Sequence, residues 1–128
     1  MGVLPFVAKD ASSAALAFHE RPIDLVHLAR TTRGDPSIEG EMLEAFGLKT
    51  SMLILRMQQA ARSSIWAAAQ ALKGSARGIG AWRIASAAEA VELAAASGAE
   101  PELESAVDRL AVVAEEARAA IAELLHGN

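Results

Sequence analysis

The stretch "LESAVDRLAVVAEEARAAIAEL", residues 103–124, decides the fold class of this chain. Its apolar residues recur at steps of four and three, which is the spacing of one face of an α-helix. They are Leu103, Val107, Leu110, Ala114, Ala117, Ile121 and Leu124. Acidic side chains occupy the other faces. The pattern therefore predicts a long amphipathic helix, opened by Pro101, whose apolar seam packs against other helices.

The composition supports an all-α protein of one domain. Hydrophobic residues make up 52% of the 128 residues, yet there is no tyrosine and there are only three phenylalanines. The core must therefore be aliphatic, and the frequent alanine, leucine, glutamate and arginine are good helix formers. The absence of cysteine excludes disulfides and thiolate metal sites.

Three more long helices are expected before residue 101. Asp35 followed by Pro36 is a favoured helix start, which predicts a helix over about 36–60. A second helix is expected from 62–64 to Gly78, and a third over about 81–96, ending at Gly98 as a C′ residue. Because the connections are short, neighbouring helices should be antiparallel. The expected fold is an up-down antiparallel four-helix bundle with a short N-terminal helix or arm.

The same spacing identifies the inner faces of two of these helices. In the helix over 36–60 the expected core residues are Ile38, Met42, Phe46, Leu53 and Met57. In the next helix they are Ile65, Ala69, Leu72, Ala76 and Ile79. Both sets recur at helical intervals, so each helix should bury one stripe.

Residues 1–22 form an expected N-terminal arm, and residues 23–128 form the bundle. The arm is either a short helix capped by Asp10 or Ser12, or an irregular segment. In "IDLVHLAR" a short helix is expected after the cap Asp24, with Leu25, Val26 and Leu28 on its apolar side. No apolar run approaches the ~20 residues of a membrane span, and the start lacks a signal-peptide pattern. We therefore expect a cytoplasmic protein with no membrane partner.

Charge is unevenly distributed along the chain. From residue 49 to residue 83 there are bases and no acids: Lys49, Arg56, Arg62, Lys73, Arg77 and Arg83. From Glu89 onward acids dominate, with only Arg109 and Arg118 as bases. This division suggests a basic face that meets an acidic partner, or ordinary solvated helix faces. A nucleic-acid partner is not expected, because the net charge is −4 and the bases form no run.

A second group of residues shares the outward face of the helix that contains Gln70. At ~100° per residue, this face carries Trp66, Gln70, Lys73, Gly74 and Arg77. Gly74 costs ~1 kcal/mol relative to alanine inside a helix, so it should be needed for close approach of another backbone, or for packing against a neighbouring helix. Ser75 is expected to bond back to a helix carbonyl rather than to act as a nucleophile.

The stretch "AQALKGSARGIGA", residues 69–81, resembles the signature of histidine-containing phosphotransfer (Hpt) domains, His-x-Leu-Lys-Gly-Ser-Ser/Ala-x-x-Leu/Ile-Gly. The matching positions are Leu72, Lys73, Gly74, Ser75, Ala76, Ile79 and Gly80. The upstream stretch "IDLVHLARTTRGDPSIEGEMLEAF" is also similar to bacterial members of the family. The resemblance extends from about residue 23 to the C-terminus. It implies a four-helix bundle that binds the receiver domain of a response regulator or hybrid histidine kinase.

Gln70 stands where that family has its phospho-accepting histidine. Imidazole accepts a phosphoryl group because its pKa of about 6.5 leaves a basic nitrogen available near neutrality. A carboxamide nitrogen is neither basic nor nucleophilic, so Gln70 should not form a phosphoramidate. The resemblance also implies that Lys73 steers toward the receiver's acidic pocket. The chain is thus expected to be a pseudo-Hpt protein, with Trp66, Gln70, Lys73, Gly74 and Arg77 in contact with the receiver.

Two alternatives remain open. The chain could be an active phosphotransferase whose acceptor histidine is replaced by glutamine here, or one that uses another histidine. His19, His27 and His126 lack the helical setting of Gln70 and are expected to be surface or packing residues. The chain could instead be a self-associating module that uses its acidic last helix. No cofactor is expected, and no residues have metal-ligand spacing.

Overall fold

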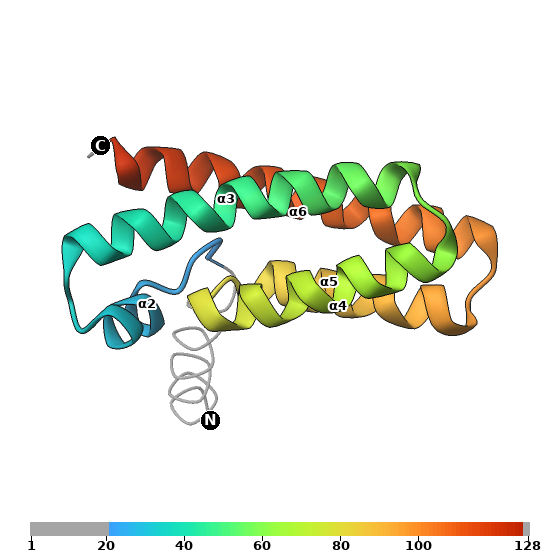
Figure 1. The fold of residues 1–128 in the computed structure, drawn as a ribbon, viewed down its shortest axis with the longest axis horizontal. Helices are drawn as coiled ribbons and strands as arrows, with labels where there is room; N and C mark the ends of the chain where they lie inside the picture. The colour runs from blue at the N-terminus through green and yellow to red at the C-terminus, as the bar shows by residue number, and fades with distance from the viewer. Residues whose placement is uncertain (1–20, 127–128) are drawn as a thin grey trace, which may run out of the picture.

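The computed structural model describes residues 21–126, and every regular element in this range is an α-helix. The five helices, with the labels of Figure 1, are α2 (Leu25–Thr32), α3 (Pro36–Gln59), α4 (Arg62–Ile79), α5 (Trp82–Ser97) and α6 (Glu100–Leu125). The expected all-α class is confirmed. The expected N-terminal helix with a cap at Asp10 or Ser12 lies outside the described residues.

The four long helices pack in a closed order. α3 contacts α4 and α6, and α5 contacts the same two helices from the other side. Figure 1 shows α3 and α6 lying along one side of the molecule and α4 and α5 along the other. The short helix α2 packs against α3 and α4. Among residues 21–126 this arrangement leaves one side of α4 uncovered along its length.

Local signals in the sequence set the helix starts. The Asp35 side chain accepts hydrogen bonds from the backbone N–H groups of Ser37 and Ile38 at 2.9 and 3.3 Å, and Pro36 occupies the first helical position. Asp24 caps α2 in the same way, by accepting from the backbone N–H of His27. Both predicted N-caps are confirmed. α6 begins one residue earlier than expected, at Glu100.

Two glycines end helices in different ways. α4 ends at Gly80, whose φ of 85° lies in the left-handed region, and a Cβ there would come within 3.1 Å of the Asp24 carbonyl oxygen. Only glycine suits this position. α5 ends at Gly98 as expected, but φ of Gly98 is −84°, so its backbone is not left-handed as a C′ residue would be.

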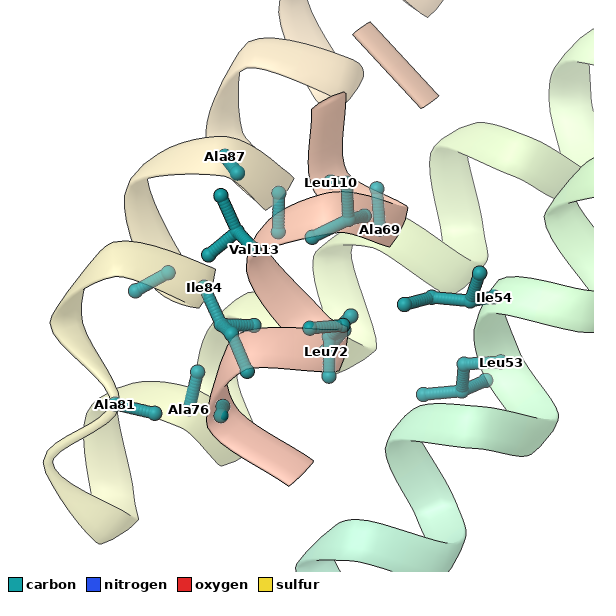
Figure 2. Packing of buried hydrophobic residues seen from close by; sticks show 14 of the residues in the cluster. Leu53, Ile54, Ala69, Leu72, Ala76, Ala81, Ile84, Ala87, Leu110 and Val113 are labelled. Carbon is teal, nitrogen blue, oxygen red and sulfur yellow. The ribbon is translucent and has the colours of Figure 1, made fainter. Parts of the chain in front are cut away.

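The predicted inner faces are largely confirmed. All five expected residues of α4 are buried, and so are those of α6 except Leu124. Figure 2 shows Leu53 and Ile54 of α3 pointing toward Leu72 of α4, in the interior that Leu110 of α6 also fills.

Four expected apolar contacts are wrong, because Ile38, Leu124, Leu25 and Val26 are exposed. α3 and α6 have 24 and 26 residues, whereas α4 and α5 have 18 and 16. In Figure 1 the start of α3 and the end of α6 extend past the end of α4. Ile38 and Leu124, near these two ends, are 44% and 42% exposed. In α2 the buried contacts come from Ile23 and Leu28 instead. None of the described helices is long and apolar enough to cross a membrane.

Candidate functional site

The candidate site is the uncovered side of α4. Trp66, Gln70, Gly74 and Arg77 are all exposed, and they follow one another at steps of four, four and three along the helix. We call these four residues the α4 strip. The structure therefore brings together four of the five residues that the sequence placed on this face.

Lys73 is the exception, and its expected outward orientation is wrong. Its side chain is only 19% exposed, and Nζ lies 2.6 Å from Oε1 of Glu92, whose side chain is 12% exposed. Lys73 follows Gln70 by three residues, about 300° around the helix, so it lies on the side of α4 that faces α5. The ammonium group of Lys73, which was expected to contact a partner protein, is thus paired with a carboxylate of the same chain.

Gly74 has no structural role within the described chain. A Cβ built at this position meets no heavy atom within 4 Å, and its φ is not positive. Packing against a neighbouring helix, one of the two expected explanations, is therefore wrong for residues 21–126. The residue keeps the backbone of α4 bare at the middle of the strip. The helix carries a destabilising residue that its own fold does not need.

Ser75 borders the strip on the side that faces α3, opposite to Lys73. Its Oγ accepts a hydrogen bond of 2.8 Å from Nζ of Lys49. The expected bond from Ser75 back to a carbonyl of its own helix is not what the structure shows. Lys49 was not among the predicted site residues, because periodicity within one helix gives no information about which neighbour it meets. The strip is thus bordered by Lys49 on the α3 side and by Lys73 on the α5 side.

The amide of Gln70 makes no hydrogen bond or other polar contact with another described residue. It can therefore donate and accept hydrogen bonds at the surface, but no neighbouring acid or base could activate it. Neither of the described histidines lies on the strip. His126 is exposed at the end of α6, and His19 lies outside the described residues.

His27 belongs to the joint between α2 and the α4–α5 connection. Its Nε2 donates to the carbonyl oxygen of Gly78 at 3.0 Å, and its ring meets the edge of Trp82 at a centroid distance of 5.0 Å. Nε1 of Trp82 donates to Oδ2 of Asp24 at 2.9 Å. Burial raises the pKa of Asp24, but the hydrogen bonds from Trp82, His27 and Val26 outweigh it and hold the pKa below its ordinary value. Sequence analysis missed Trp82, which joins the start of α5 to Asp24 and His27.

In the folded protein three of the six bases of the middle segment pair with acids of the C-terminal segment. Arg62 pairs with Glu100 at 2.9 Å, Lys73 with Glu92, and Arg83 with Glu116 at 3.0 Å. The expectation that these bases form one face for an acidic partner is therefore wrong for three of them. Arg56 and Arg77 are exposed and make no ion pair with another described residue.

Other candidate chemistry is limited in the part of the chain that the structure covers. Between residues 21 and 126 no three His, Cys, Asp or Glu side chains gather closely enough to hold a metal ion. A groove of about 370 Å³ lies between α3 and α6, and none of the α4 strip residues lines it. Comparison with protein-family models, curated proteins and solved structures finds no match for this chain.

Proposed function

We propose that this chain is a cytoplasmic pseudo-Hpt protein of a two-component phosphorelay. It binds the receiver domain of a response regulator or hybrid histidine kinase through the α4 strip and does not accept phosphate. In this proposal residues 23–128 form the functional unit, with α3 to α6 as an up-down antiparallel four-helix bundle and α2 as an appendage. It acts by occupying the receiver domain, and so competes with a true phosphotransfer protein for the same receiver.

The observation that carries the proposal is the bare backbone at Gly74. The glycine lies one turn after Gln70, at the middle of an exposed helix face, and nothing in the described chain approaches it. A glycine at such a place lets a second protein approach the helix backbone closely. It also belongs to the stretch that resembles the Hpt signature. Local structure and resemblance thus both point to the helix face around Gln70 and Gly74.

The two cationic residues at the strip differ in how readily they can meet an acidic partner. Arg77 is exposed and has no ion-pair partner among residues 21–126, so it can meet a receiver carboxylate directly. Lys73 must first exchange Glu92 for a carboxylate of the receiver. Since this exchange replaces one ion pair by another, Lys73 contributes more to orientation than to affinity.

Substitutions at Gly74 test the proposal. Gly74→Leu should weaken binding to a purified receiver domain by more than about 30-fold, because the side chain stands where the receiver approaches. Gly74→Ala should weaken binding less while stabilising the fold by about 0.5–1 kcal/mol, since alanine is the better helix former. Binding is measured by titration calorimetry against the receiver domains of the source organism, and stability by urea unfolding.

Gly47 in α3 supplies the matched control. A Cβ at Gly47 also meets nothing within 4 Å, so Gly47→Ala should give a similar gain in stability with unchanged receiver binding. Lys73→Glu, which places a like charge beside Glu92 and toward an acidic receiver, should also weaken binding. If Gly74→Leu and Lys73→Glu both bind a receiver as the unaltered chain does, the docking face is not the α4 strip.

A further inference from the structure

The outer side of α3 carries an apolar stripe that the described part of the chain leaves uncovered. Leu48, Met52 and Leu55 are 66%, 62% and 56% exposed, and they follow one another at steps of four and three. Leu93 and Val112 are similarly exposed, but Leu93 has no exposed large apolar neighbour on α5, and Val112 lies about three turns before Leu124 and Leu125, the other exposed ones on α6. Single exposed apolar residues are ordinary on protein surfaces, whereas a continuous stripe marks an interaction surface.

The stripe is the middle of a longer helical repeat. Glu41 and Ala45 precede it and Gln59 follows it, so the positions 41, 45, 48, 52, 55 and 59 alternate steps of four and three. This is the spacing of a coiled-coil seam. All of these residues are exposed. α3 therefore has two seams, an inner one that is buried and an outer one that has no partner among residues 21–126.

We propose that the outer seam of α3 is the interface between two copies of this chain, with the two α3 helices antiparallel. The seam positions are symmetric about residue 50, because 41 pairs with 59, 45 with 55, and 48 with 52. A two-fold axis beside residue 50 places Leu48 opposite Met52 of the second copy and Ala45 opposite its Leu55. One self-complementary surface thus serves both copies, as in other two-fold dimers.

Charge complementarity selects a second copy in this orientation. Glu41 lies near the start of the outer seam and Arg56 beside its end, and neither makes an ion pair with another described residue. In the antiparallel pair Glu41 comes within one helical turn of Arg56 of the second copy, at both ends of the seam. In a parallel pair Glu41 of one copy would face Glu41 of the other, and the two carboxylates would repel each other. Lys49, on the flank of the seam, is directed toward α4 by its hydrogen bond to Ser75.

This interface differs from the self-association considered for the last helix. The apolar seam of α6 is buried inside the chain from Leu103 to Ile121, so it offers no surface to a second copy. The inference goes beyond the proposed function and does not depend on it, since it involves α3 and needs no receiver. It can therefore be tested on the purified chain alone.

Sedimentation equilibrium over a range of protein concentrations tests the interface. The unaltered chain should associate reversibly to a dimer, and Met52→Glu should weaken the dimer by at least about tenfold, because it places a charge in the apolar centre. The control is Val112→Glu, which changes an equally exposed apolar residue on α6 and should leave the dimer unchanged. A chain that stays monomeric at all concentrations, or a dimer that tolerates Met52→Glu, overturns the proposal.

A charge exchange tests the antiparallel register. Glu41→Lys and Arg56→Glu should each weaken self-association, since each puts like charges together at both ends of the seam. When the two variants are mixed, the lysine at 41 meets the glutamate at 56, and the unchanged pair forms at the other end. The mixture should therefore dimerise as the unaltered chain does. Failure of the mixture to recover association, or an Arg56→Glu variant that dimerises normally, contradicts this arrangement.

Discussion

At the scale of single residues, the α4 strip combines a polar amide with a bare backbone. Gln70 and Gly74 are neighbours one turn apart; the Gln70 amide has no polar partner among the described residues, and a Cβ at Gly74 would meet no heavy atom within 4 Å. Where a residue is not constrained by packing or hydrogen bonds within its own fold, binding to a partner can determine which amino acid is found there. The chemistry of the amide then limits what the partner can receive: hydrogen bonds, but no covalent phosphoryl transfer.

Restoring an imidazole at position 70 should restore transfer. In the proposed site Gln70→His would place a nucleophilic nitrogen on the exposed side of α4, beside Gly74 and Arg77. We expect this variant to gain acid-labile phosphate from a phosphorylated receiver domain, whereas the unaltered chain gains none. The measurement is transfer of radiolabelled phosphate between the purified proteins.

Two further variants make the labelling experiment decisive. Gln70→Ala removes the amide without adding a nucleophile and should stay unlabelled. Gln70→His combined with Gly74→Leu should lose the label, because the receiver can no longer approach. Labelling of the unaltered chain would refute the pseudo-Hpt proposal and support an acceptor at another histidine.

At the scale of helices, sequence patterns predict positions along each helix better than contacts between helices. The starts at Asp24 and Asp35 and the buried stripe of α4 could be predicted, because capping and periodicity are local. The ion pair of Lys73 could not, since it depends on which face of α5 lies alongside. The exposure of Ile38 could not either, because it follows from the unequal lengths of packed helices.

Arg62 is a second contact that local patterns could not predict. α5 has no basic residue in its last turn, and Gly98 after it is not left-handed. Nη1 of Arg62 instead hydrogen-bonds to the carbonyl oxygens of Ala94, Ala95 and Gly98 at 3.0, 3.1 and 2.9 Å. The first residue of α4 thus caps the end of α5, and its pairing with Glu100 also joins both helices to the start of α6.

Removal of this guanidinium should be costly for a partly exposed residue. Arg62→Met leaves the last carbonyls of α5 without their charged donor, so we expect a loss of about 1.5–3 kcal/mol in the free energy of unfolding. Arg83→Met removes an exposed ion pair with Glu116 and should cost less than about 1 kcal/mol. Urea unfolding followed by circular dichroism compares the two. Equal losses would mean that Arg62 acts only as one more surface ion pair.

At the scale of the whole molecule, the joint at α2 connects segments that are distant in sequence. The Asp24 carboxylate caps α2 and accepts from Trp82 at the start of α5, while the Asp24 backbone N–H donates to the Gly80 carbonyl oxygen at 2.9 Å. The N-cap could be predicted from sequence, but the link to Trp82 could not, since 58 residues separate the two. Asp24 thus helps to hold three helices together: its carboxylate joins α2 to α5, and its backbone N–H joins α2 to the end of α4.

The stability of the folded chain should therefore depend on the protonation of Asp24. Because its pKa is lower in the folded chain than in the unfolded one, the carboxylate stabilises the fold fully above the unfolded pKa of about 3.9. This contribution is lost as the pH falls through the lower, folded pKa. Asp24→Asn keeps the shape but removes the charge and one of the two acceptor oxygens that His27 and Trp82 use, so at pH 7 it should unfold more easily by about 0.5–2 kcal/mol. The gap between the variant and the unaltered chain should narrow as the pH falls through the folded pKa.

Urea unfolding at pH 7 and at successively lower pH values below 4 measures this convergence, with Trp82 fluorescence reporting the joint and circular dichroism reporting the helices. Asp108→Asn is the control, since Asp108 is exposed on α6 and makes no hydrogen bond or ion pair with another described residue. Its difference from the unaltered chain should be small at every pH. A stability gap for Asp24→Asn that stays constant as the pH falls would show that the cap and the indole contact do not depend on the charge of Asp24. The joint would then be held by shape and packing alone, through Gly80 and the ring contact between His27 and Trp82.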